Sequence, residues 1–193
     1  NLGNLATLRC NYQEARTYLM RSREMSAQIG TDKGVFFADW SLGKLALAQR
    51  KLEEVQTRIN STLESNFVKA APLPRQFMQS YLGYVQILLG NQQEGQTIFT
   101  SILETVLELH EQTGGVLGDI GDDWYFYDGQ ARLELMGKRY ERAAQLFGVA
   151  WARREEGSYP IFEAERPDYE ARIAEIRADL GDIAFEAAFQ KGQ

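Results

Sequence analysis

The chain contains a single histidine, His110, and a single cysteine, Cys10, and this scarcity limits the chemistry that it can perform. One cysteine forms no intrachain disulfide and no cysteine-based zinc site. His110 stands beside Glu111 near the end of a predicted helix, where the helix dipole favours a basic side chain. No convergent acid, base and nucleophile emerge from the sequence, so we expect no catalytic residue, no metal site and no cofactor.

A glycine-rich segment, Gly-Gly-Val-Leu-Gly-Asp-Ile-Gly at residues 114–121, is a second pattern that suggests chemistry. Phosphate-binding loops continue such glycines into a Gly-Lys-Ser/Thr sequence and follow a strand. This segment has neither feature. We interpret it as a connector that can border a binding groove.

Acidic residues flank the aromatic run Trp124-Tyr125-Phe126-Tyr127, and they are Asp119, Asp122, Asp123 and Asp128. A calcium loop places its ligands at alternate positions and closes with a glutamate, which is not the spacing here. We expect Asp122 or Asp123 to cap the helix that follows. Four consecutive aromatic residues cannot share one face of a helix, so one or two of them are expected to project into a groove.

The overall composition argues against several partners. A formal net charge of −6 offers no basic face for nucleic acid or for an anionic membrane surface. No apolar run approaches the roughly 20 residues of a membrane-spanning helix, and no signal peptide is visible, so we expect a cytoplasmic location. The chain begins without a methionine, and we expect it to be part of a larger protein.

A repeat of forty residues organises the elements that must position these side chains. The dipeptide Leu-Gly recurs at residues 2–3, 42–43 and 82–83, and a glutamate recurs at positions 14, 54 and 94. A fourth repeat follows after forty-eight residues and places Ala131 where the first three repeats carry glycine. The inserted stretch is residues 112–123.

Each repeat is predicted to form two antiparallel helices. The first helix of repeat two is expected over about residues 33–50, with Thr31 or Asp32 as its N-cap. Small residues at one position of each repeat let the two helices approach closely, although glycine costs a helix about 1 kcal/mol relative to alanine. These residues are Gly3, Gly43, Gly83 and Ala131.

The predicted fold is an all-α array of stacked helix pairs with a C-terminal two-helix cap. Stacking is required because no single pair can bury its own apolar face. Four pairs are expected within residues 1–157, at about 1–30, 31–68, 70–113 and 121–157. Pro167 suits a first helical turn, and residues 158–193 are expected to cover the apolar end of repeat four.

The segments Asn1-Leu-Gly-Asn-Leu-Ala and Asn11-Tyr-Gln-Glu-Ala resemble the tetratricopeptide repeat (TPR) in its forty-residue form. The leucine, the small residue, the aromatic residue after the turn and the alanine match that family's pattern. The resemblance extends to about residue 157, but in repeat three Gln92 and Gly95 replace an aromatic residue and an alanine. It implies a right-handed superhelical array, an α-solenoid, with a concave groove that binds partners.

The C-terminal part is similar to the end of the repeat region in large bacterial signalling ATPases that resemble LuxR-type transcriptional regulators. The similarity rests on residues 141–156, on Arg166-Pro-Asp-Tyr-Glu170 and on residues 180–189. It implies a sensing or scaffolding arm in transcription regulation or signalling, and it does not identify a ligand.

First-helix side chains line the concave surface of tetratricopeptide arrays, and by register Phe37 is one of them. Exposed aromatic residues mixed with isolated charges suit peptide or small-ligand recognition. The alternative for each aromatic residue is packing against the neighbouring repeat. We expect contacts from Trp40, Lys44, Tyr84, Trp124, Tyr125 and Arg132.

Three binding hypotheses remain open. In the first, the groove holds a protein or peptide, which includes another domain of the parent chain. In the second, the array senses a small effector and passes the change to an ATPase module. In the third, the apolar edge of repeat one mediates self-association into a homodimer. Direct contact with nucleic acid or a membrane is not expected.

Overall fold

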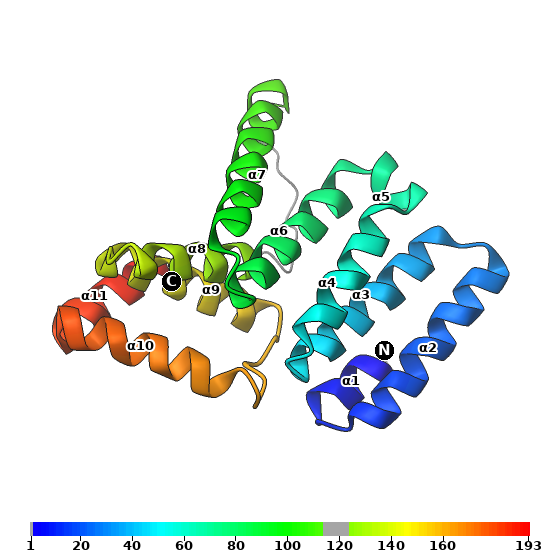
Figure 1. The fold of residues 1–193 in the computed structure, drawn as a ribbon, viewed down its shortest axis with the longest axis horizontal. Helices are drawn as coiled ribbons and strands as arrows, with labels where there is room; N and C mark the ends of the chain where they lie inside the picture. Colours follow the sequence, from blue (N-terminus) through cyan, green and yellow to red (C-terminus); the bar gives the residue numbers. More distant parts are fainter. Residues whose placement is uncertain (1, 114–123) are drawn as a thin grey trace. The chain divides into compact units, whose positions relative to one another are not determined.

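Every regular element of the described chain is an α-helix, so the predicted all-α class is confirmed (Figure 1). The computed structural model describes residues 2–113 and 124–193, without the side chains of residues 72–73 and 106–113. None of the described helices is long and apolar enough to cross a membrane. The helices are α1 (Leu2–Leu8), α2 (Tyr12–Ile29), α3 (Asp32–Ala48), α4 (Leu52–Leu63), α5 (Asn66–Ala70), α6 (Pro72–Leu88), α7 (Gln92–Thr113), α8 (Trp124–Met136), α9 (Tyr140–Glu156), α10 (Arg166–Leu180) and α11 (Asp182–Gly192).

The turns between helices reproduce the spacing of the sequence repeat. One residue in each of four turns has a positive φ: 58° at Cys10, 56° at Arg50, 88° at Gly90 and 56° at Lys138. In each turn the next residue donates its backbone N–H to the carbonyl five residues earlier, at 2.9 to 3.0 Å. This is the Schellman arrangement that ends a helix. The forty-residue period is therefore also a period of backbone geometry.

The two helices of a pair approach closely at two of the predicted small residues. A Cβ atom built on Gly3 would lie 2.6 Å from the side chain of Leu19, and one built on Gly83 would lie 2.6 Å from that of Phe99. Leu19 and Phe99 occupy the same position of their repeats, and both are fully buried. A larger residue at either glycine would require the opposing side chain or its helix to shift, so close approach is confirmed for these pairs.

The chain divides into two compact units. The N-terminal unit comprises residues 1–78 together with 161–165. Its helices α1, α2, α3 and α4 lie side by side (Figure 1). The core between α1, α2 and α3 is formed by Ala6, Ala15, Leu19, Leu42 and Leu45. Of the two predicted N-caps, Thr31 caps α3 by accepting a hydrogen bond from the Gly34 N–H at 3.2 Å, and Asp32 is the first residue of the helix.

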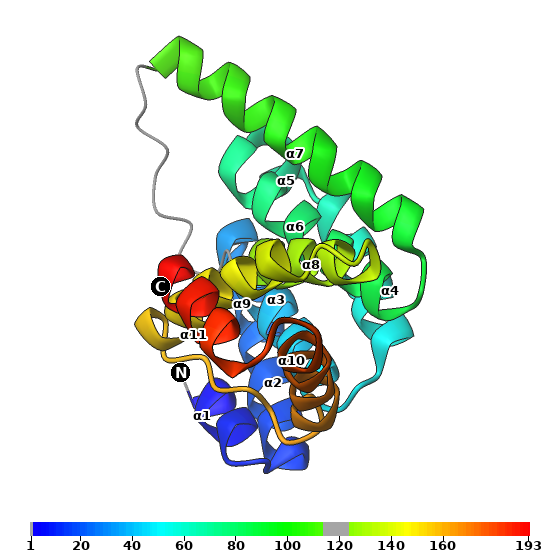
Figure 2. The same cartoon turned by 90° about the vertical axis from the view of Figure 1, so that its left-hand side faces the viewer.

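The C-terminal unit comprises residues 79–160 and 166–193. Here α8 and α9 form a pair, and α10 and α11 pack on α9 (Figure 2). Ile176 of α10 and Phe185 of α11 join Phe147 of α9 in one buried cluster. The last two helices therefore bury apolar surface of repeat four. The boundary at residue 157 between array and cap stays a prediction.

Candidate functional site

The predicted contact residues fall into two groups, one in each compact unit. Trp40 and Lys44 lie on α3 in the N-terminal unit. The other four lie in the C-terminal unit, with Tyr84 on α6 and with Trp124, Tyr125 and Arg132 on α8.

The first group belongs to what we call the α3 aromatic cluster, which consists of Phe36, Phe37, Trp40, Lys44, Phe67 and Phe77. The Trp40 and Phe77 rings meet edge to face with centroids 4.4 Å apart. The Lys44 Nζ lies 4.1 Å from the centroid of the Trp40 ring, within cation–π range. Phe67 on α5 contacts Phe36, with centroids 5.3 Å apart. Ring contacts within the cluster thus connect α3 with α5 and with α6.

Phe37 is the accessible member of the α3 aromatic cluster. Its side chain is 45% exposed, whereas Phe36 and Phe77 are buried and Trp40 is half-buried. Residues 37, 40 and 44 share one face of α3 because they are three and four positions apart. The register placed Phe37 on the predicted concave surface, but it was not among the six expected contacts. Its exposure could not be inferred from the register.

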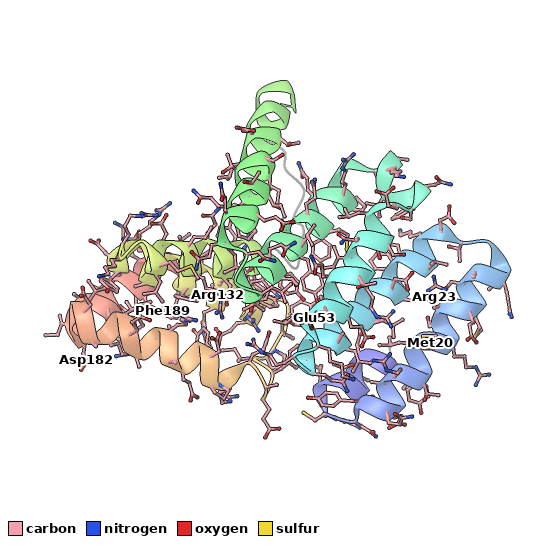
Figure 3. All side chains as sticks on the ribbon, in the orientation of Figure 1. Met20, Arg23, Glu53, Arg132, Asp182 and Phe189 are labelled. Carbon is pink, nitrogen blue, oxygen red and sulfur yellow. The ribbon has the colours of Figure 1, made fainter. Side chains whose placement is uncertain are left out.

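Two residues of the second group, Tyr84 and Arg132, belong to what we call the α8 ionic cluster. Its members are Tyr84, Asp128, Arg132, Asp168 and Tyr169. Arg132 (Figure 3) donates through Nε to Asp128 Oδ1 and through Nη1 to Asp168 Oδ2, both at 2.6 Å. The side chains of Arg132 and Asp128 are 5% and 2% exposed, and that of Asp168 is 26% exposed. Asp168 comes from α10, so the cluster links the cap to α8.

Burial and neighbouring charges shift the pKa values of two side chains in the α8 ionic cluster. Burial lowers the pKa of Arg132, but the charges of Asp128, Tyr84 and Asp168 outweigh it and raise that pKa well above its ordinary value. Burial, with a contribution from the charge of Asp128, raises the pKa of Tyr169 to about 12. Arg132 is therefore a fixed cation and Tyr169 a neutral phenol at physiological pH.

The aromatic residues of the second group pack against one another and against a second arginine. The Trp124 and Tyr125 ring centroids are 3.7 Å apart, and Tyr125 stacks on Tyr81 at 4.3 Å. The Arg154 guanidinium carbon lies 3.4 Å from the Trp124 ring centroid. Tyr84, Trp124 and Tyr125 are each 1% exposed. These aromatic side chains are therefore packed inside the unit, which was the alternative to ligand contact. Their role as ligand contacts stays a prediction.

Several predicted features lie outside the described residues. They are the glycine-rich segment at 114–121, Asp119, Asp122 and Asp123, and the His110 side chain. Among the side chains that the structure does describe, no group of three or more histidine, cysteine, aspartate or glutamate residues is arranged to hold a metal ion.

No protein-family model, curated protein or solved structure matches this chain. The tetratricopeptide resemblance therefore rests on the residues of the chain itself.

Proposed function

We propose that the chain is a non-enzymatic interaction module that binds a protein or peptide partner. The repeated turns at residues 10, 50, 90 and 138 support an array of equivalent helix pairs. Such arrays act through extended surfaces to which each repeat contributes a few side chains. The single histidine and single cysteine of the sequence favour binding over catalysis.

The observation that carries this proposal is the exposed edge of the α3 aromatic cluster. Phe37 is exposed next to a half-buried Trp40, with ring centroids 6.1 Å apart. Phe36 contacts both of these rings, and Phe77 meets the Trp40 ring edge to face. Rigid aromatic side chains supply large contact area with little loss of conformational entropy, and they are enriched in interface hot spots. A partner that presents an apolar side chain would bury Phe37 on this surface.

The architecture that we propose for this module is a right-handed α-solenoid of the tetratricopeptide type. Its C-terminal resemblance to bacterial LuxR-type regulators supports a place as a scaffolding arm in a larger regulatory protein. Small-effector sensing, self-association and a cytoplasmic location stay predictions from the sequence.

A peptide selection tests the proposed binding surface. Peptides displayed on phage are selected against the whole chain, and the dissociation constants of the best binders are measured by calorimetry. Phe37→Ala should weaken binding by about tenfold or more, since truncation of a hot-spot aromatic costs about 1–2 kcal/mol or more. The control is Arg142→Ala, which alters an exposed side chain of α9 and should leave the affinity unchanged.

Circular dichroism of the Phe37→Ala variant checks that its helices are intact. Peptides that bind the wild type and the Phe37→Ala variant with equal affinity would place the interaction elsewhere and contradict the proposal. A selection that yields no binder would also contradict it.

A further inference from the structure

An open cavity of about 380 Å³ lies in the N-terminal unit between α2, α3 and α4. Met20 and Arg23 on α2 form one wall (Figure 3). Asp39 on α3 contributes one carboxylate. Residues from one face of α4 form the opposite wall, and they are Glu54, Thr57, Arg58 and Ser61. The cavity lies within the size range of small-ligand sites.

Both carboxylates of this cavity are already satisfied by arginines. Arg58 donates to Glu54 Oε1 through Nε at 3.0 Å and through Nη2 at 2.8 Å. Arg16 donates to the same carboxylate at 3.1 Å, and Arg23 donates through Nε to Asp39 at 2.6 Å. Burial raises the pKa of Glu54, but the hydrogen bonds from Arg58 and Arg16 outweigh it and bring the pKa below its ordinary value. The carboxylates therefore do not attract a further cation.

The arginines keep donors that no described residue uses. Arg23 makes its hydrogen bond through Nε alone, which leaves Nη1 and Nη2, and Arg58 leaves Nη1. A guanidinium has five N–H groups in a fixed fork that matches a carboxylate. Arg23 and Arg58 line the cavity with two positive charges against the two negative charges of Asp39 and Glu54. Arg16 does not line the cavity, but it pairs with Glu54 and adds a third positive charge beside it.

The arginines at this cavity are not part of the forty-residue repeat. Forty residues further along the chain, the positions of Arg16, Met20 and Arg23 are occupied by Gln56, Asn60 and Leu63. The position of Arg58 is occupied by Ile98, and that of Asp39 by Gln79. Of the charged positions at this cavity, only that of Glu54 is charged again in the next repeat, where Glu94 occupies it. The cations at the first junction are an addition to the repeat pattern.

We propose that the cavity between α2, α3 and α4 binds a carboxylate group. The free terminal nitrogens of Arg23 and Arg58 donate to its oxygens, and the Ser61 hydroxyl supplies a further donor. The Met20 side chain contacts the aliphatic carbons next to the carboxylate. This chemistry occurs in a free organic acid and in an acidic side chain of a peptide. The site is separate from the α3 aromatic cluster, so either proposal can fail without the other.

Amide chemical shifts test this site directly. Glutarate and the peptide acetyl-Gly-Glu-Gly-amide are titrated into the whole chain labelled with ¹⁵N, with acetyl-Gly-Gln-Gly-amide as the neutral counterpart. We expect saturable shifts at Thr57, Arg58 and Ser61 with at least one acidic probe and none with the neutral peptide. The shifts should weaken at high salt, because the arginines that bind the carboxylate are partly exposed. Saturable shifts with glutarate alone would indicate that the ligand is a free acid. Saturable shifts with the acidic peptide alone would indicate an acidic side chain.

Three variants assign the binding to the cavity. The double variant Arg23→Gln/Arg58→Gln should bind the acidic probe at least tenfold more weakly. Arg9→Gln removes an exposed arginine that does not line the cavity and should bind like the wild type. Ser61→Asp alters an exposed side chain, so it should fold normally, and its new carboxylate should occupy the site and abolish binding. If no acidic probe gives saturable shifts, or if Ser61→Asp binds like the wild type, the proposal is wrong.

Discussion

Arg132 binds two carboxylates, and only one of them comes from its own helix. Asp128 lies one turn earlier on α8, whereas Asp168 lies on α10 and reaches Arg132 Nη1 at 2.6 Å. A buried ion pair need not stabilise a fold relative to apolar residues of the same volume. Replacing only one partner of a buried ion pair is costly, because the charge of the other partner is then left buried without compensation.

The variant Arg132→Met should therefore destabilise the chain by about 3–5 kcal/mol. The triple variant Arg132→Met/Asp128→Asn/Asp168→Asn should recover much of that loss, because no uncompensated charge remains. Urea unfolding followed by circular dichroism measures both. A single variant as stable as the wild type would contradict the described ion pairs.

The sequence placed Arg132 on a binding surface, and its burial shows where that reasoning stops. Register assigns a side chain to a face of its helix, but it does not say which other element covers that face. Asp168 lies outside the repeat, so no periodicity links it to Arg132. The cavity arginines Arg23 and Arg58 were also missed, since on α2 and α4 each looked like an ordinary surface charge.

At the scale of the elements, the turn between α6 and α7 rests on one backbone conformation. Gly90 has a φ of 88°, which L residues adopt only at a cost. A Cβ atom added there would meet nothing within 4 Å, so a substitution acts through the backbone alone. The equivalent residues Cys10, Arg50 and Lys138 adopt a similar conformation without being glycine.

Gly90→Ala should destabilise the chain by about 1 kcal/mol, because alanine at positive φ is strained. Gly90→Asn should cost less, since asparagine tolerates the left-handed region better. Thermal unfolding of the two variants gives the comparison. Equal stability of all three proteins would mean that this turn does not hold the left-handed conformation.

Helix pairing could be predicted from the sequence because it follows from local rules. The forty-residue period located the helix pairs, small residues marked close approach, and Thr31 marked the start of α3. The first helix of repeat two was expected to end near residue 50, and α3 ends at Ala48. The repeat pattern alone did not reveal the five-residue segment 161–165, which follows α9 yet belongs to the N-terminal unit.

At the scale of the whole molecule, we predict that the four repeats stack in sequence order. Equivalent helices of successive repeats in such a stack are about 10 Å apart, the spacing of packed helices. Positions 14, 94 and 142 are equivalent in repeats one, three and four, and their side chains are exposed. Distances among them therefore report the stacking.

Spin labels give the most direct measurement, in a Cys10→Ser background that removes the exposed native cysteine. One double variant carries Glu14→Cys and Glu94→Cys, and the other carries Glu14→Cys and Arg142→Cys. Pulsed electron resonance should give about 20 Å for the first pair and about 30 Å for the second, before equal additions from the labels. If the second distance is equal to the first or shorter, the repeats do not form a continuous stack.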